Sequence, residues 1–231
     1  MILSNKKIIS ERKNGNIIIE PFNKKNVCTS SYDVTLGENF YREQKPIKWK
    51  ENLFNIYSQT SMERIFGRPM IATRADEVII EYLGEGKEAI GKEESEGINP
   101  DDKVILIKPG ETILCHTIEF IGGRNNITTS MQARSGIGRS FIEVCKCAGW
   151  GDVGYFNRWT MEITNNSKYH TIPLVVGRRI AQIIFLETYP IIGDDYSKTG
   201  DYQKDNDLEK LKVSWKPEMM LPRVYKDREA K

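Results

Sequence analysis

The chain has 231 residues, enough to bury one good hydrophobic core without needing a second domain. Its 34 basic and 32 acidic side chains leave a net charge of +2, which argues against nucleic-acid binding through a general excess of positive charge. No apolar run approaches the roughly 20 residues of a membrane span, and the N-terminal segment lacks the apolar core of a signal peptide. Four cysteines without an export signal indicate free thiols. We therefore expect a soluble, cytoplasmic protein that binds neither nucleic acid nor a membrane.

The first predicted element is a short helix over residues 4–14. Ser4 is a suitable N-cap, Leu3 can pack back onto Ile8, and Gly15 ends the helix.

Short runs of β-forming residues follow, separated by turn signals such as Pro109-Gly110 and Gly122-Gly123. The runs cover residues 17–19, 104–107, 112–121, 159–163 and 179–185. Many short strands at a spacing of about 8–12 residues predict a mainly β fold, a sandwich or a jelly-roll-like barrel.

Two segments differ in composition from this β pattern. Residues 45–102 are polar and irregular, and we interpret them as a surface insertion with one strand at 77–82. From Asp194 the chain is charged and poor in aliphatic residues, so it should bury little area and stay mobile without a ligand. We therefore predict one β-barrel domain over 1–193 and a flexible C-terminal lid over 194–231.

Residues 134–139, Arg-Ser-Gly-Ile-Gly-Arg, form a glycine-spaced basic loop. Its glycines let backbone N–H groups approach an anion closely, and Arg134 and Arg139 can add bidentate bonds to phosphate oxygens. The loop lacks the Gly-Lys-Ser/Thr ending of a Walker motif. A solvated turn with two surface arginines is the alternative that this pattern leaves open.

The run from Trp159 to Thr164 places a carboxylate in a predicted strand. Strand alternation puts Trp159, Met161 and Ile163 on one face, and Glu162 on the other face between two threonines. In a half-buried strand, Glu162 can have a raised pKa and act as a general acid and base. A strand glutamate that faces water is the alternative.

A tight turn is predicted between these two motifs, because Gly154 and Asn157 are residue types that tolerate positive φ. Asp152 in this turn can accept hydrogen bonds from sugar hydroxyls or orient a water, although a turn-capping aspartate is equally simple. Cys145 and Cys147, with Cys115-His116, lack standard zinc-finger spacing, so we expect no zinc.

These segments, in this order, resemble the trimeric dCTP deaminase/dUTPase family. The family pattern is approximately R-S-S-L-G-R, T-A-G-W-I-D-P-G-F-x-G-x-I-T-L-E and G-x-x-I-A/G-Q. This chain matches it at residues 134–139, 147–155, 160–162 and 177–182, with the family's ten-residue step from Asp152 to Glu162. The N-terminal MILSNKKI, IIIEPF and SSYDVTLG also resemble the opening of dCTP deaminases.

The resemblance implies a distorted jelly-roll barrel of the trimeric dUTPase-like type, and hence a homotrimer that acts on free dCTP or dUTP. Glu162 would be the proton shuttle for water that attacks C4 of cytosine, with Ser135 and Arg139 holding that water. Residues implied to contact the nucleotide are Arg134, Ser135, Gly136, Ile137, Gly138, Arg139, Ala148, Asp152, Thr160, Met161, Glu162, Gln182 and Tyr196. Among them, the backbone of Ala148 and Thr160 would form hydrogen bonds with the base edge. Asp152 would contact the 3′-hydroxyl of the deoxyribose, and Gln182 and Tyr196 would contact the phosphates.

Mg²⁺ would arrive on the substrate triphosphate, because it screens the repulsion among the phosphate oxygens. The H-x-E and P-C-x-x-C signature of zinc deaminases is absent from the sequence.

Gly149-Trp150 resembles the dUMP-forming, bifunctional branch of the family rather than the branch with a His-Arg pair there. Two alternatives remain, a dUTP diphosphatase and a catalytically inactive trimeric nucleotide-binding regulator. The tail favours the second alternative, because Asp201 stands where the family has a lysine.

Overall fold

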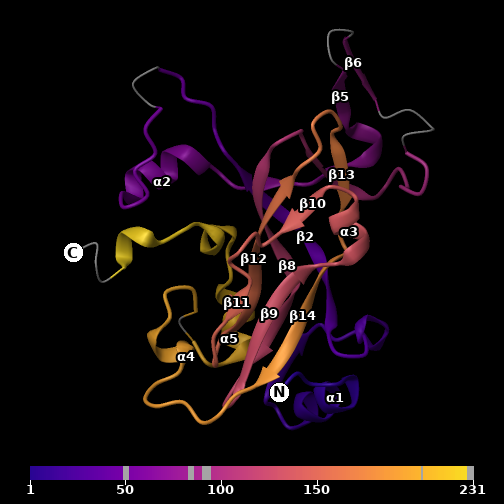
Figure 1. Cartoon of the computed structure of the whole chain (residues 1–231). Helices are drawn as coiled ribbons and strands as arrows, with labels where there is room; N and C mark the ends of the chain where they lie inside the picture. Colours follow the sequence, from indigo (N-terminus) through magenta and orange to yellow (C-terminus); the bar gives the residue numbers. More distant parts are fainter. Residues whose placement is uncertain (49–51, 83–85, 90–94, 204, 228–231) are drawn as a thin grey trace.

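The computed structural model describes residues 1–231 except 49–51, 83–85, 90–94, 204 and 228–231. It confirms a mainly β architecture with few helices (Figure 1). The strands are β1 (Ile17–Glu20), β2 (Tyr32–Arg42), β3 (Met70–Ile71), β4 (Thr73–Arg74), β5 (Ile79–Tyr82), β6 (Gly86–Ala89), β7 (Lys103–Ile107), β8 (Thr112–Gly123), β9 (Ile127–Ala133), β10 (Ile142–Val144), β11 (Trp150–Gly151), β12 (Phe156–Asn165), β13 (Ile172–Val175) and β14 (Arg179–Glu187). The α-helices are α1 (Asn5–Lys13), α2 (Gln59–Phe66), α3 (Ser135–Arg139), α4 (Tyr196–Thr199) and α5 (Leu208–Ser214).

The main sheet has nine strands, and its main path runs β10-β12-β8-β2-β14-β9-β11, with β1 added on β8 and β3 on β2. Strand β8 is central, and it is buried along nearly all of its length, as expected of a strand covered on both faces. A three-stranded sheet, β13-β7-β4, and the hairpin β5-β6 complete the described strands.

The predicted N-terminal helix is confirmed as α1, with Ser4 at its N-cap and Leu3 and Ile8 buried. All five predicted strand runs are present, as β1, β7, β8, β12 and β14. Strand β2 was not among the predicted strands; it lies between β8 and β14 in the sheet and pairs with both. None of the described helices is long and apolar enough to cross a membrane.

The segment 45–102 is more regular than predicted. Helix α2 buries Met62 and Ile65, and β4 pairs with β7 of the three-stranded sheet. The strand predicted at 77–82 is present as β5, preceded by a 3₁₀ turn at Ala75–Glu77. Parts of this segment (49–51, 83–85 and 90–94) lie outside the described residues.

The C-terminal segment packs on the main sheet, so the expectation that it buries little area is wrong. Leu211 of α5 packs with Phe120 and Phe156, and Met220 packs with Tyr41 and Leu114. Its mobility without a ligand stays a prediction.

Gln203 fastens this segment to the start of β12. The Gln203 side chain is buried, accepts a hydrogen bond from the Phe156 N–H (2.7 Å) and donates one to the Gly154 carbonyl (2.9 Å).

The antiparallel pairing of β8 with β12 requires a glycine at position 122. A Cβ there would collide with the carbonyl oxygen of Tyr155, at the point where Phe156 pairs with Gly122. We expect Gly122→Ala to lower the free energy of unfolding by about 1–3 kcal/mol, as overpacked sites do. Gly138→Ala is the matched control, because a Cβ at that position meets nothing within 4 Å. Thermal unfolding should show a lower Tm for the first variant only, and equal Tm values would contradict this account.

Candidate active site

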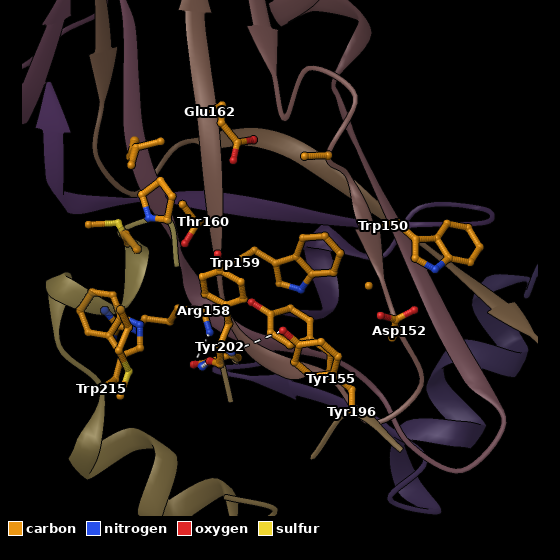
Figure 2. Close-up of a pocket in the computed structure, with 17 residues that line it drawn as sticks. Trp150, Asp152, Tyr155, Arg158, Trp159, Thr160, Glu162, Tyr196, Tyr202 and Trp215 are labelled. Carbon is orange, nitrogen blue, oxygen red and sulfur yellow. Dashed lines mark hydrogen bonds between the residues drawn. The ribbon is translucent and has the colours of Figure 1, made fainter. Parts of the chain in front are cut away.

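A cavity of about 380 Å³ lies between β12, the turn before it and the C-terminal segment (Figure 2). Its lining residues are Leu114, Ala148, Trp150, Gly151, Asp152, Tyr155, Asn157, Arg158, Trp159, Thr160, Glu162, Tyr196, Tyr202, Trp215, Met219, Met220 and Pro222. The cavity therefore combines aromatic walls with a few polar groups, as small-molecule sites commonly do.

The side chain of Glu162 points into this cavity from β12. The predicted alternation is present, because Trp159, Met161 and Ile163 are buried in the core while Thr160 and Glu162 line the cavity. Burial raises the pKa of Glu162, which its own backbone and Lys146 only partly oppose. The Oε2 atom is buried and has no hydrogen-bond partner among the described residues. A desolvated carboxylate with a free lone pair suits proton transfer near neutral pH.

Beside Glu162, the backbone of β12 is open on one edge. The Glu162 carbonyl accepts from the Cys145 N–H (3.0 Å), on the side of the short strand β10. Alternate residues of a strand direct their backbone groups to the same side, so Thr160 also faces that edge. After Cys145 the chain turns away from β12, and the Ala148 N–H donates a hydrogen bond to the Cys145 carbonyl (2.6 Å). A planar base edge can therefore lie beside the Thr160 backbone, as the resemblance implied.

The predicted tight turn is present at the start of β12. The Tyr155 N–H donates to the Asp152 carbonyl (3.0 Å), and Gly154 has a φ of 92°. Asp152 lines the cavity with an exposed side chain, so it is available to a sugar hydroxyl. Tyr196, the tail residue singled out in the sequence, lies against Tyr155 with ring centroids 5.3 Å apart.

The basic loop lies elsewhere on the chain. Residues 135–139 form α3 after β9, and the side chains of Ser135 and Arg139 are exposed. Neither residues 134–139 nor Gln182 of β14 are among the described residues that line the cavity. Within one copy of the chain, the predicted phosphate-binding loop therefore lies outside the cavity that holds the predicted catalytic glutamate.

A buried aspartate that the sequence analysis did not single out holds this loop. Asp33 of β2 is 2% exposed and pairs with Arg134 Nε (3.0 Å) and Arg179 Nη1 (3.1 Å). The ion pairs fix Arg134 while leaving its terminal nitrogens for an external anion. Asp33 stands between Tyr32 and Val34, and a charged residue between two apolar ones is the signal that could have identified it.

Comparison with known proteins now settles the family. The family model described as dCTP deaminase-like matches residues 2–188. The chain belongs to the dCTP deaminase-like family. The relative named "dCTP deaminase, dUMP-forming" from Methanococcus aeolicus is 31% identical over 81% of this chain and 84% of its own length. The relative of the same name from Methanocaldococcus jannaschii is 33% identical over 87% of this chain and 91% of its own length.

The dCTP deaminase fold is also found by structural comparison. The solved 2′-deoxycytidine 5′-triphosphate deaminase of Agrobacterium tumefaciens aligns with a TM-score of 0.50 and 16% identity. The alignment covers 80% of this chain and 47% of the Agrobacterium chain, so the likeness concerns the fold alone.

In this dCTP deaminase-like chain, Gly149 and Trp150 have different structural roles. Trp150 lines the cavity and is 61% exposed, whereas Gly149 is not among the described lining residues. A Cβ at Gly149 would collide with the Met131 carbonyl oxygen, because β11 pairs with β9 immediately after it. Gly149 is therefore required by backbone packing.

We expect the raised pKa of Glu162 to make the wild type lose stability as pH rises. The ordinary pKa of a glutamate is 4.5, and the pKa of Glu162 in the folded state is higher. Between these two pH values the folded state binds more protons than the unfolded state, so the free energy of unfolding falls as the pH rises. Glu162→Gln should therefore be more stable than the wild type at pH 7.5, with the difference shrinking below pH about 4.5. Urea denaturation at both pH values measures it. Glu43→Gln, at an exposed position, is the control, and a Glu162→Gln variant less stable at pH 7.5 would contradict the account.

Proposed function

We propose that this chain is a dUMP-forming dCTP deaminase. It would convert dCTP and water to dUTP and ammonia, and then dUTP and a second water to dUMP and diphosphate. The observation that carries the proposal is the buried Oε2 of Glu162, which has no hydrogen-bond partner among the described residues, beside the open backbone edge of Thr160. The names of the relatives at 31% and 33% identity support the same activity.

In the deamination step, Glu162 takes a proton from the water that attacks C4. The same carboxyl group then returns a proton to the amino group, which leaves as ammonia. Because burial raises the pKa of Glu162, this carboxyl group holds a proton more readily than an exposed glutamate does, which favours its acting both as acceptor and as donor. The Thr160 and Ala148 backbone would hold the base edge while this proton moves. A dUTP diphosphatase alone would give this carboxylate no task.

We further propose that the site is completed by a neighbouring copy in a homotrimer. Among the described residues that line the cavity, Arg158 is the only lysine, arginine or histidine. A triphosphate, in contrast, carries several negative charges. The exposed loop 134–139 supplies two arginines and a serine on another part of the surface. In a closed ring, each copy can place this loop against the cavity of the next one. Mg²⁺ would enter as part of the substrate, bound to its phosphates.

The first test of this proposal is the product. We expect purified protein with dCTP and Mg²⁺ to release ammonia, dUMP and diphosphate in equal amounts, because dUTP stays bound between the two steps. Asp152, exposed in the cavity, would orient the second water. Nucleotide chromatography over a time course measures this. Stoichiometric release of free dUTP would show a plain deaminase, and failure to consume dCTP would refute the proposed activity.

The second test concerns the shared site. Glu162→Gln and Arg139→Ala should each lower turnover by about 10²–10⁴-fold or more, because each removes one half of the proton-transfer and water-holding machinery. Subunits of the two variants, mixed one to one and reassembled, should regain about a quarter of wild-type activity if each site draws its two residues from different copies.

The control for this test is reassembly of each variant with itself, which should restore nothing. Mixed trimers that stay as inactive as the separate variants would place both residues in the same copy and contradict the shared site.

A further inference from the structure

Arg158 lines the cavity from β12, four residues before Glu162, and neither the sequence motifs nor the mechanism above gives it a task. Its guanidinium lies over two aromatic rings, with the centroid of Phe120 at 5.2 Å and that of Trp215 at 4.6 Å. Trp215 comes from the C-terminal segment, so the tail holds the cation in place through its ring face.

The guanidinium of Arg158 forms no close ion pair with the residues that the structure describes. It has no ion pair within 4.0 Å in the described part of the chain, and its Nε is buried without a hydrogen-bond partner. Glu119 and Glu38 both attract it from a distance. Glu119 already accepts bonds from the N–H (3.0 Å) and the hydroxyl (2.9 Å) of Thr35, and Glu38 pairs with Lys103 (2.5 Å). Burial lowers the pKa of Arg158, as desolvation of a cation should. An anion entering the cavity would relieve this cost.

Three side chains mark three corners of the cavity in Figure 2, with Glu162, Asp152 and Arg158 well separated from one another. Along β12, Arg158 lies roughly 13 Å from Glu162 at about 3.3 Å per residue, which is longer than a pyrimidine ring. With C4 of the base at Glu162 and the 3′-hydroxyl at Asp152, the 5′ side of the sugar faces the remaining corner.

We propose that Arg158 binds a phosphate of the nucleotide, on the same copy that carries the catalytic glutamate. This inference rests on the proposed function and adds a cation to the one that the neighbouring copy would supply. Arg158 occupies a position that varies in the family motif, and Trp215 lies beyond residues 2–188, the part that the family model matches. The proposed phosphate contact therefore combines Arg158 of β12 with Trp215 of this chain's own tail, which packs against the guanidinium.

The experiment compares nucleotide and nucleoside binding in a background that does not turn over. In Glu162→Gln protein, calorimetry gives the Kd for dCTP and for deoxycytidine. Adding Arg158→Met keeps an unbranched apolar side chain between the two rings and removes the charge. We expect the Kd for dCTP to rise about tenfold or more, as loss of a charge-assisted bond does, with the Kd for deoxycytidine unchanged.

Arg124→Met is the matched control. Arg124 also lies over an aromatic ring (Phe156, 4.2 Å) with a buried, unpartnered Nε, but it is not a lining residue of the described cavity. This variant should leave both Kd values unchanged. If Arg158→Met does not fold, Arg158→Lys replaces it, and the Kd for dCTP alone should rise severalfold because the bidentate geometry is lost.

Two results would overturn the role of Arg158. One is an unchanged Kd for dCTP in the folded variant, and the other is an equal loss of affinity for dCTP and deoxycytidine, which a purely structural role produces. A Glu162→Gln parent that binds no dCTP would instead refute the proposed deaminase function itself.

Discussion

Backbone pairing of β12 with β8 on one side and with β10 on the other fixes the position of Glu162. The ladder with β10 stops at Val144, and the chain then turns away, so the carboxylate comes out of the sheet beside an unpaired stretch of backbone. Sheet burial keeps water from the carboxylate, and the missing neighbour strand leaves room for a ligand. The proposed acid–base group and the backbone proposed to hold the base therefore lie at one short interruption of a strand pair.

Much of this site could be predicted from residues that are close in sequence. Strand alternation identified the face that carries Glu162, and a glycine at position 154 identified the turn that carries Asp152. Both inferences depend on local geometry, which a short run of sequence determines. The position of the loop 134–139 relative to the cavity could not be predicted in this way, because within the chain it depends on the order of the strands in the sheet.

Other features were missed because average composition hides them. Strand β2 alternates threonine, glycine and asparagine with apolar residues, and Asp33 is buried there only because two arginines from distant segments neutralise it. The C-terminal segment is mostly charged, yet Leu211, Trp215 and Met220 suffice to anchor it on the sheet. A few well-placed anchors decide the path of such a segment, and a percentage of apolar residues does not reveal them.

The close approach of Gly149 to the Met131 carbonyl also constrains how this protein can change over evolutionary time. Any side chain at position 149 first requires β11 to move away from β9, so the order in which substitutions arise matters. A substitution of Trp150 meets no such packing limit, since its side chain is largely exposed, whereas a histidine at 149 requires the spacing of the two strands to widen first. Position 149 of this chain therefore accepts a side chain only after the backbone of β11 has shifted relative to β9.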